Sequence, residues 1–413
     1  MQETFLTEFE KRGYFNQCTD QSGLNELMAQ GKIKAYIGFD CTASSLHVGS
    51  LMQIMCLRLL QKHGHQPIIL LGGGTTLIGD PSGKEETRKI LNKNEIDKNI
   101  KSIEKIFKIF LNSKNAKTKP IFANNYSWLS KLNYINFLRE IGKYFTINKM
   151  LTFDSVKLRL EREQSLSYME FNYMILQSYD FYELNKKYNC ILQIGGSDQW
   201  GNIVNGTDLI KRKNKKQTYC LTTPLITTTS GIKMGKTEQG AVWLNKKMFS
   251  PYDYWQFWRN TDDKDVVKFL KLFTDLDIDA IDKFEKNTED INQLKILLAN
   301  EATTLLHGKK AAKDSELTAQ KTFADKSIGK NLPTTKIKKE IIAKGINILD
   351  LVIQTQLANS KGEIRRMIKN NGLKINNETV TDETKIITKK NFDQEDNMKV
   401  SHGKKQHIIF KII

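Results

Sequence analysis

The chain has 413 residues, of which 64 are Lys or Arg and 46 are Asp or Glu, so its formal net charge is +18. This length predicts two or three domains, and a hydrophobic content of 39% can build a sizeable core, which excludes wholesale disorder. No run approaches ~20 uninterrupted apolar residues, so the sequence predicts no membrane-spanning helix. The positive charge favours a polyanionic partner such as nucleic acid, although a lysine-rich solvated surface gives the same charge.

The cysteines and the first residues predict a cytoplasmic protein. The five cysteines form no CxxC pair, which argues against a zinc ribbon or a redox motif and suits a reducing compartment. The first ten residues contain Glu3, Glu8 and Glu10 and no basic segment before an apolar core. They are typical of neither a secretory signal nor an organellar transit peptide.

The first half of the chain alternates apolar strand patterns with helical patterns, which predicts a parallel sheet. Strands are expected at residues 35–39, 67–71 and 190–194, and a helix is expected from about 47 to 63. Residues 84–119 are rich in Lys and Asn and predict an exposed helical excursion.

The second half shows helical periodicity from Ser250 and Pro251, a capping residue and a first-turn proline, to about residue 326. Residues 326–344 contain Gly329, Pro333 and several lysines, and we interpret them as a linker. Residues 330–413 hold 17 basic and 9 acidic residues and form a distinct, basic region.

Two glycine-containing segments follow predicted strands. The first, DCTASSLHVGS (40–50), lies at a predicted helix start, where free N–H groups favour an anion. His47 can donate to a phosphate oxygen, and Gly49 permits a ligand to approach the backbone closely. A histidine at the surface near a helix start is the simpler interpretation of His47 alone. LGGGTTLIGDPSGK (71–84) has neither Walker A nor GxGxxG spacing, and a pair of tight turns explains it equally well.

Three further segments carry polar side chains at candidate site positions. Tyr173, Gln177 and Asp180 share one helix face within about 60°, which makes them either a solvated stripe or the lining of a site. QIGGSDQWG (193–201) places an acid after a strand end, where ribose hydroxyls commonly bind, although a turn is a serious alternative. Lys233 and Lys236 lie in a glycine-bordered loop suited to a polyphosphate, or in an ordinary basic loop.

HVGS (47–50) followed by KMGKT (233–237) is similar to the HIGH and KMSKS signatures of class I aminoacyl-tRNA synthetases. With YIGFDCTASSLHVGS, IGDPSGK, NYMILQSYD and LQIGGSDQWGNI, the chain resembles bacterial-type tyrosyl-tRNA synthetases over nearly its whole length. The resemblance implies an α/β fold: a Rossmann-like parallel-sheet catalytic domain with a connective insertion (1–230), a helical anticodon-side domain that begins with the second signature (231–330), and a small α+β RNA-binding domain like that of ribosomal protein S-four (345–413).

The reaction that this resemblance implies joins tyrosine and ATP to tyrosyl-adenylate with release of pyrophosphate, and then transfers tyrosine to the 3′ end of tRNA(Tyr). The substrate carboxylate is itself the nucleophile, so catalysis depends on positioning and on stabilising phosphate charge. By matching position, the catalytic residues are His47, Thr42, Lys84, Arg88, Lys233 and Lys236.

The resemblance also assigns binding residues. The implied tyrosine-binding residues are Tyr36, Asp80, Asn125, Tyr173, Gln177, Asp180 and Gln199. The implied ATP-binding residues are Asp40, Gly49, Ser50, Gly196, Asp198 and Lys236. RNA contacts are implied for Arg365, Arg366 and Lys369. Mg²⁺ is expected to enter with ATP, and no protein-bound metal is expected.

Two departures from the signatures stand out. Ser50 replaces the second histidine of the first signature, so the nucleotide contact should be weaker or water-mediated. Gly235 and Thr237 replace the two serines of the second signature, while both lysines are present.

The resemblance further implies a homodimer. In the sequence, only an apolar and aromatic stretch at 125–160 supports this, including Trp128, Leu132, Phe137 and Phe145, and burial in the chain's own core explains the stretch equally well. Three alternative functions are a tryptophanyl-tRNA synthetase, a non-catalytic RNA-binding protein on a synthetase scaffold, and a small-molecule nucleotidyltransferase. The pairing of Tyr36 with Asp180 argues against the first, the intact signature lysines against the second, and the basic C-terminal region against the third.

Overall fold

The computed structural model describes residues 4–80, 91–229, 231, 234–237, 240–287, 290–323, 332–355, 357–358, 360–403 and 406–413, with the backbone alone at 154, 155, 236, 237, 322 and 323. The chain forms two compact units. The first comprises Met1–Met234, Trp243–Asn245 and Asp262–Glu289, and the second comprises Gly235–Val242, Lys246–Thr261 and Asp290–Ile413. In the described ranges, no helix is both long and apolar enough to cross a membrane.

A six-stranded sheet forms the centre of the first unit, in the order β1-β6-β5-β2-β3-β4. All neighbouring pairs are parallel except β1 with β6, which is antiparallel. The central strands are continuous apolar runs because helices cover both faces of the sheet. The strands are β1 (Gln17–Cys18), β2 (Lys34–Phe39), β3 (Gln66–Leu71), β4 (Ile121–Asn124), β5 (Leu192–Gly196) and β6 (Tyr219–Thr223). The parallel α/β sheet predicted from the sequence is thereby confirmed.

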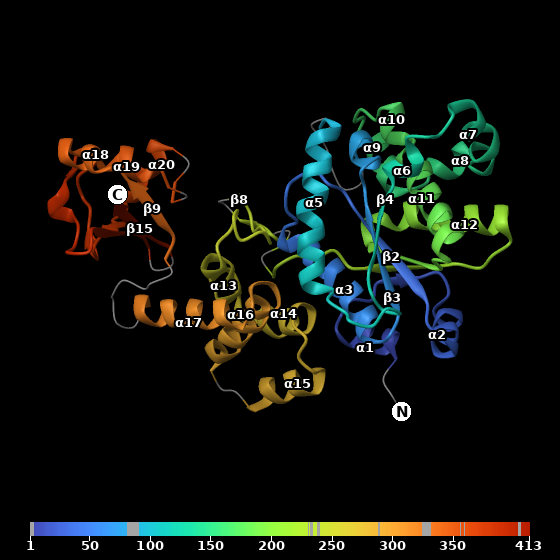
Figure 1. Ribbon diagram of the computed structural model, residues 1–413, viewed down its shortest axis with the longest axis horizontal. Coiled ribbons are helices and arrows are strands. Elements are labelled where there is room, and N and C mark those ends of the chain that lie inside the picture. The colour runs from blue at the N-terminus through green and yellow to red at the C-terminus, as the bar shows by residue number, and fades with distance from the viewer. Residues whose placement is uncertain are drawn as a thin grey trace. The chain divides into compact units, whose positions relative to one another are not determined.

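Helices α3 and α5 lie on one side of this sheet, and α11 and α12 lie on the other (Figure 1). The longer helices of the first unit are α1 (Phe5–Lys11), α2 (Gln21–Gln30), α3 (Leu51–Lys62), α5 (Lys93–Phe110), α7 (Tyr134–Glu140), α9 (Asp154–Glu161), α11 (Tyr173–Tyr188), α12 (Trp200–Asn214), α14 (Val266–Phe273) and α15 (Ile278–Asn287). Single-turn helices are α4 (Thr75–Ile78), α6 (Tyr126–Leu129), α8 (Ile147–Met150) and α10 (Tyr168–Phe171).

Helix α5 corrects the expectation of an exposed excursion at 84–119, of which residues 84–90 lie outside the described ranges. It begins with a capping box in which Asn92 accepts from the backbone of Glu95. Its apolar residues recur every three or four positions and are buried, while its other face is exposed. The segment is therefore amphipathic, with its inner face packed into the first unit.

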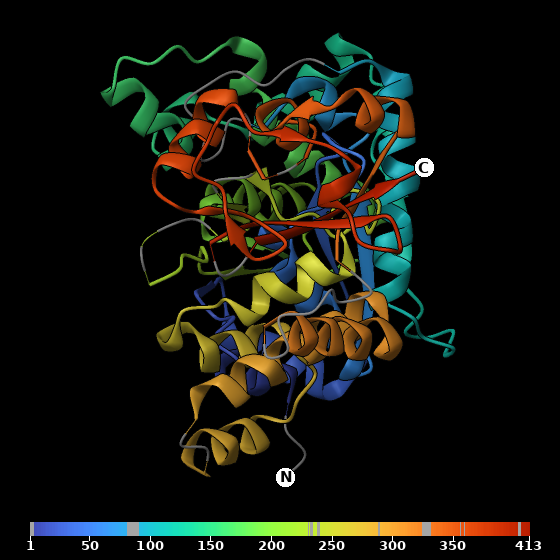
Figure 2. The same ribbon diagram turned by 90° about the vertical axis from the view of Figure 1, so that its left-hand side faces the viewer.

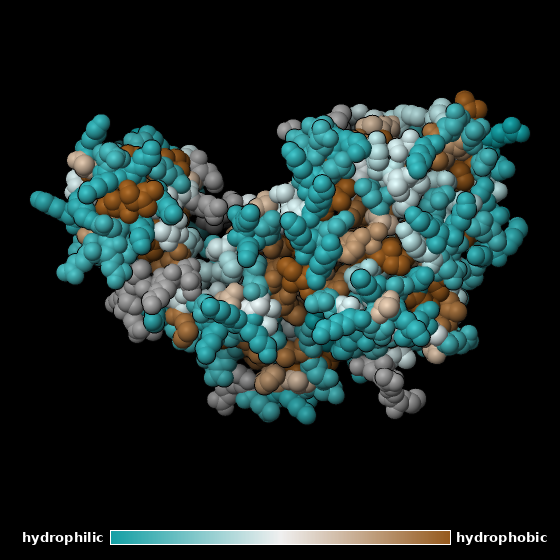
Figure 3. Space-filling model, viewed as in Figure 1, coloured by the Kyte–Doolittle hydropathy of each residue, from teal (hydrophilic) through white to brown (hydrophobic). Residues whose placement is uncertain are grey.

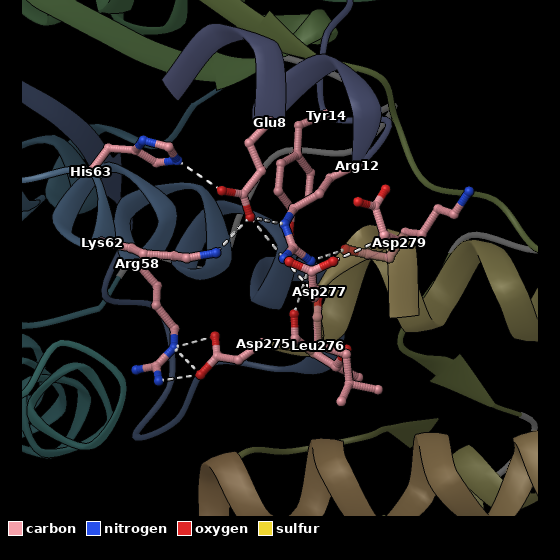
Figure 4. A network of polar contacts seen from close by, with 12 residues as sticks. Glu8, Arg12, Tyr14, Arg58, Lys62, His63, Asp275, Leu276, Asp277 and Asp279 are labelled. Atoms are coloured by element: carbon pink, nitrogen blue, oxygen red, sulfur yellow. Dashed lines mark hydrogen bonds and ion pairs between the residues drawn. The ribbon is translucent and has the colours of Figure 1, made fainter. Parts of the chain in front are cut away.

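A buried carboxylate joins α1 to the end of α3 (Figure 4). Glu8 is 3% exposed, accepts a hydrogen bond from Arg12 Nε at 2.9 Å and pairs with Lys62 Nζ and His63 Nε2, each at 2.8 Å. Burial raises the pKa of Glu8, but the hydrogen bonds from His63, Lys62 and Arg12 outweigh it and hold that pKa well below its ordinary value. Glu8 is thus a charged residue of the core.

The other N–H groups of Arg12 reach the last turn of α14 and the residues that follow it (Figure 4). Its guanidinium donates to the carbonyl oxygens of Lys271 at 2.9 Å, Thr274 at 3.1 Å and Leu276 at 2.9 Å. These carbonyls at the end of a helix have no partner within it, so Arg12 caps the helix from a distant part of the sequence. This contact is one of several that join residues 262–289 to the first unit, together with the Arg58–Asp275 ion pair and the Tyr14 hydroxyl, which donates to the carbonyl oxygen of Leu272 at 2.6 Å.

The second unit contains a helical region and a C-terminal sheet. The helical region includes β7 (Lys236–Thr237), β8 (Gly240–Ala241), α13 (Pro251–Arg259), α16 (Ile291–His307) and α17 (Lys309–Phe323). The predicted helix start is confirmed, because Ser250 Oγ accepts from the backbone N–H of Asp253 at 3.1 Å and Pro251 is the first residue of α13.

The C-terminal sheet has the order β12-β11-β14-β15-β9. Helices α18, α19 and α20 lie along one face of it (Figures 1 and 2) and bury apolar residues against it. The elements are β9 (Thr334–Ile337), α18 (Lys339–Lys344), β10 (Ile346–Asn347), α19 (Ile348–Val352), α20 (Lys361–Lys369), β11 (Leu373–Ile375), β12 (Glu378–Thr379), β13 (Ile386–Ile387), β14 (Asn397–His402) and β15 (Gln406–Ile412).

The interpretation of residues 326–344 as a linker is wrong from residue 334 onward. Strand β9 pairs in parallel with β15, and Ile337 and Ile342 belong to the C-terminal core. The compact units also differ from the expected boundaries, since residues 262–289 lie in the first unit. The division into domains at 1–230, 231–330 and 345–413 stays a prediction. The C-terminal sheet nevertheless begins at about residue 332, before the predicted start of the last domain at residue 345.

Candidate active site

A cavity of about 450 Å³ opens at the carboxyl ends of β2 and β5. Strand β2 pairs with β3 over six residues but with β5 only through Ala35 and Tyr36, so the two strands separate beyond Tyr36. The chain turns to opposite sides of the sheet from these two strands, and ligands of open α/β sheets bind in the crevice at such a switch point.

The structure brings together fourteen of the residues singled out in the sequence. They come from five separate segments, and each lines this one cavity: Tyr36, Asp40, Thr42, His47, Gly49, Ser50, Asp80, Asn125, Tyr173, Gln177, Asp180, Gly196, Asp198 and Gln199. The polar face of α11 is therefore the lining of a cavity and not a solvated stripe.

One wall of the cavity contains a buried carboxylate. Asp180 is 1% exposed and accepts hydrogen bonds from Asn125 Nδ2 at 2.9 Å and Trp128 Nε1 at 2.7 Å. Burial raises the pKa of Asp180 to about 7, with a smaller contribution from the charge of Asp40, although the two hydrogen bonds act in the opposite direction. Near neutral pH this carboxyl therefore exchanges between its acid and its ionised form.

A second unusual group lies on the neighbouring strand. The hydroxyl of Tyr36 is fully buried and has no hydrogen-bond partner in the described part of the chain. Burial raises the pKa of this phenol well above its ordinary value, and the charge of Asp180 raises it further, so Tyr36 stays protonated. A buried donor without a partner is costly, and a ligand hydroxyl placed between Tyr36 and Asp180 would satisfy it.

Asn125 holds this wall in place. Its Oδ1 accepts from the backbone N–H of Gly74 at 2.7 Å, and its Nδ2 donates to Thr75 Oγ1 at 3.0 Å as well as to Asp180. Both N–H groups of the amide are engaged by protein. Asn125 therefore links Asp180 to Gly74 and Thr75, and its role in binding tyrosine stays a prediction.

A cluster of acceptors lies beside this wall. Gln199 Nε2 donates to Asp80 Oδ2 at 3.0 Å, and the Tyr173 hydroxyl lies 3.4 Å from Asp40 Oδ1. Gln177 follows Tyr173 by one turn of α11 and lines the same cavity. The carboxylates and amide oxygens in this part of the cavity suit a positively charged group of a ligand.

The first signature segment forms the other end of the cavity. His47 Nδ1 accepts from the backbone N–H of Gly49 at 3.0 Å, so a neutral ring carries its proton on Nε2 and can donate it to an anion. A Cβ atom at Gly49 would lie 2.6 Å from His47 Cε1 and 2.9 Å from the carbonyl oxygen of Met234. Only glycine fits between the two signature segments.

Two further residues predicted to contact the nucleotide line the cavity: Ser50, the last residue of the first signature, and Gly196. Ser50 stands at the start of α3, and its hydroxyl makes no capping hydrogen bond to that helix. A Cβ atom at Gly196 would lie 2.5 Å from Asp198 Oδ1, so glycine allows the exposed carboxylate of Asp198 to fold back over the strand end.

Several predicted residues lie outside this geometry. Lys84, Arg88 and Lys233 are outside the described residues, and Lys236 contributes only its backbone, in β7. The RNA-binding candidates lie on the exposed face of α20, opposite the face packed on the C-terminal sheet: Arg365, Arg366 and Lys369. Among the described residues, no group of three or more His, Cys, Asp or Glu side chains is placed to hold a metal ion.

The structure adds residues that sequence reasoning did not assign to the site. Trp128 donates to Asp180, and Gln53, Gln193 and Trp243 line the cavity. A sequence signal existed for two of them, because Trp128 follows Asn125 by three residues in a short helix and Gln53 follows Ser50 by three residues in α3. Such spacing places side chains on one helix face.

Comparisons with known proteins identify the class of protein to which this chain belongs. The family model for class I tRNA synthetases (W and Y) matches residues 28–324, and the model for the SYY-like C-terminal domain of tyrosine–tRNA ligase matches residues 323–410. A tyrosine–tRNA ligase of Pelagibacter ubique is 64% identical over 99% of both chains. One of Rickettsia rickettsii is 52% identical over 99% of this chain and 100% of its own length. The chain belongs to the tyrosine–tRNA ligase family.

Solved structures agree with this assignment. A C-terminally truncated mitochondrial tyrosyl-tRNA synthetase from Aspergillus nidulans is 30% identical and has a TM-score of 0.71, over 78% of this chain and 95% of that one. A tryptophanyl-tRNA synthetase from Plasmodium falciparum shares the fold at 15% identity and a TM-score of 0.54. The tryptophan alternative is not supported, because the C-terminal model and the relatives at 64% and 52% identity are of the tyrosine type.

Proposed function

We propose that the chain activates L-tyrosine with ATP to tyrosyl-adenylate and pyrophosphate, and then transfers tyrosine to the 3′ end of tRNA(Tyr). The observation that carries this proposal is that two buried polar residues, Asp180 and Tyr36, line the same cavity. A ligand phenol donates to Asp180 and accepts from Tyr36, which leaves neither group unpaired. Phenylalanine lacks the hydroxyl, so it would leave Tyr36 without a partner and would give Asp180 no third donor, and the pocket discriminates against it.

The rest of tyrosine follows from this orientation. Its ammonium group meets the acceptors of Asp80, Tyr173 and Gln177, and Gln199 lies near its carboxylate. The carboxylate then faces the first signature segment, where it attacks the α-phosphate of ATP. The reaction needs no protein nucleophile, and the enzyme acts by holding the two reactants in line.

ATP occupies the end of the cavity that contains the first signature. Thr42 and the Nε2–H of His47 stabilise the phosphates during the transfer, while Asp40, Gly49, Ser50, Gly196 and Asp198 contact the nucleotide. By family resemblance, four cations clamp the departing pyrophosphate: Lys84, Arg88, Lys233 and Lys236. Mg²⁺ enters as the counterion of ATP. The five cysteines are free thiols in the structure, which supports a cytoplasmic setting.

A homodimer is the second part of the proposal. The 125–160 stretch is divided between two environments: Phe137 and Phe145 pack onto a core cluster, whereas a row of large apolar side chains is exposed. That row includes Tyr134, Ile135, Leu138, Ile147 and Leu151, of which Ile135 is 67% exposed. Exposed apolar residues gathered in one region are typical of a protein interface. Sedimentation analysis should find a dimer that Ile135→Glu converts to monomer.

Pyrophosphate exchange tests the activation step. With purified protein and each of the twenty amino acids, exchange of pyrophosphate into ATP should occur with tyrosine alone. Exchange with tryptophan would contradict the roles of Asp180 and Tyr36. Absence of exchange in a folded protein that binds RNA would favour the scaffold alternative and direct attention to Ser50.

Removal of the C-terminal region tests the tRNA step. A truncation at residue 345 would leave β9 without β15, so the clean variant ends before residue 332. It should activate tyrosine normally but charge tRNA poorly, because it lacks Arg365, Arg366 and Lys369. Equal loss of both activities would contradict the assignment.

A further inference from the structure

Helix α5 presents an acid-free row of lysines. At 3.6 residues per turn, Asn94, Lys98, Lys101, Lys105 and Lys108 fall within an arc of about 80°. All five are exposed, and no Asp or Glu lies among them. We call Lys98, Lys101, Lys105 and Lys108 the α5 lysine face. In Figure 3, hydrophilic side chains cover the helix labelled α5 in Figure 1.

The orientation of this helix is fixed from the opposite side. Ile96, Ile100, Ile103 and Phe107 are buried in the first unit. Asn99 Nδ2 donates at 2.9 Å to the carbonyl oxygen of the cysteine that follows Asp40. The helix cannot rotate to hide its charges, so the α5 lysine face is a permanent part of the surface.

The charges on this face are largely uncompensated. Lys108 approaches Glu104 at 3.4 Å, but Lys98, Lys101 and Lys105 form no ion pair with any described residue. Residues 93–119 contain eight lysines and three acids. Like charges three or four residues apart destabilise a helix. A solvent-exposed helix can avoid this cost by mixing acidic and basic residues, as α15 does with the sequence IDAIDKFEKN.

We propose that the α5 lysine face is a second RNA-binding surface, which holds the phosphate backbone of double-stranded RNA without reading its sequence. The lysines span about 15 Å along the helix axis, enough to contact several successive phosphates. A membrane surface fits less well, because a helix that is stably anchored at a membrane adds an exposed apolar face to its basic charge, and the apolar residues of α5 are buried, with Ile109 as the exception. The surface is independent of tyrosine chemistry, since an inactive cavity would leave it intact.

Neutralising three lysines tests this surface in the full chain. We compare Lys98→Gln/Lys101→Gln/Lys105→Gln with a control of equal charge change, Lys264→Gln/Lys283→Gln/Lys286→Gln, whose lysines are exposed among acids in the same unit. The probe is a fluorescent RNA duplex of arbitrary sequence, titrated from 50 to 300 mM salt. Each lost phosphate contact lowers the slope of log K against log salt by about 0.9, so the α5 variant should lose about 2–3 in slope and at least about tenfold in affinity. The control should match the parent protein.

A footprint on the unaltered protein gives a second measurement. Acetylation of lysines, followed by mass spectrometry, should show Lys98, Lys101 and Lys105 protected when the duplex is bound. Equal salt slopes for the two triple variants, or unprotected α5 lysines, would overturn the inference. So would binding to vesicles of phosphatidylserine and phosphatidylcholine without binding to the duplex. If the α5 variant behaves like its control while the protein activates tyrosine and charges tRNA, the inference fails and the proposed function stands.

Discussion

Tyrosine binding should release a proton near neutral pH, because Asp180 must be ionised to accept the phenol hydroxyl. The unliganded carboxyl has a pKa of about 7, which burial raises. A hydrogen bond donated by the ligand favours the charged form and lowers that pKa in the complex. The free protein therefore holds a proton below about pH 7 that the complex does not. Affinity for tyrosine should rise as the pH rises to about 7 and stay constant above it.

The pKa sets the size of the effect. At pH 5.5, which is 1.5 units below a pKa of about 7, only about 3% of the carboxyl is ionised, so the Kd for tyrosine should be up to about 30-fold weaker than at pH 8. That ratio corresponds to about 2 kcal/mol of binding free energy. The carboxyl group of free tyrosine titrates below this range, and its amino group titrates above it, because the adjacent carboxylate stabilises the ammonium form.

Titration calorimetry at several pH values, in two buffers with different heats of protonation, measures both the Kd and the number of protons released. About one proton should leave at pH 5.5 and about 0.1 at pH 8. Asp180→Asn should weaken binding and abolish the pH dependence. Asp253→Asn is the matched control, because the pKa of Asp253 is also raised by burial but this residue lies in α13, outside the cavity. The same Kd at pH 5.5 and pH 8, with no proton released, would refute the reasoning.

Three further substitutions test other contacts. Arg12→Met removes the partner of a buried carboxylate and three carbonyl contacts, so urea unfolding of the first unit should show a loss of about 3–5 kcal/mol. Arg58→Met, whose ion pair lies at the surface, should lose about 1 kcal/mol, and equal losses would contradict the role of burial. Gly49→Ala should displace His47 and lower kcat for tyrosine activation by about 100-fold. Gly31→Ala is the control and should be neutral, because no atom lies within 4 Å of the added Cβ. A normal kcat for Gly49→Ala would show that its Cβ does not clash with His47. Ser50→His should change the KM for ATP more than that for tyrosine, and the reverse pattern would remove Ser50 from the nucleotide site.

The clustering of the site residues could be predicted from the sequence because the carboxyl ends of parallel strands meet at one edge of a sheet. Asp40 follows β2, Asp80 follows the short helix α4 after β3, and Asp198 follows β5, so all three reach the same cavity. The stripe on α11 was ambiguous in the sequence, since its period is the same whether it faces water or a ligand. Only the structure, in which Tyr36 of β2 lines the same cavity as the polar residues of α11, shows that the stripe faces a ligand site.

Other features depend on contacts that leave no local pattern. Strand β9, TTKI, is short and half exposed, and its partner residues in β15 lie about 75 positions further along the chain, so the surrounding Gly, Pro and Lys favoured a linker. The contacts of Arg12 and Tyr14 with residues 271–276 end on backbone carbonyl oxygens, which every residue has. A backbone acceptor carries no sequence signal, so the capping of α14 by Arg12 could not be predicted.

The reach of Arg12 bears on how the chain folds while it is being made. Arg12 and Leu276 are 264 residues apart, and at ~5–20 residues per second a ribosome needs roughly 13–50 s to pass from one to the other. For that interval the Arg12 side chain must wait for the carbonyl oxygens that it caps in the finished protein. The sheet can pair earlier, but the nascent first unit stays incomplete until residues near 276 have emerged. Translation pauses before that point would lengthen the time in which a newly made chain depends on chaperones.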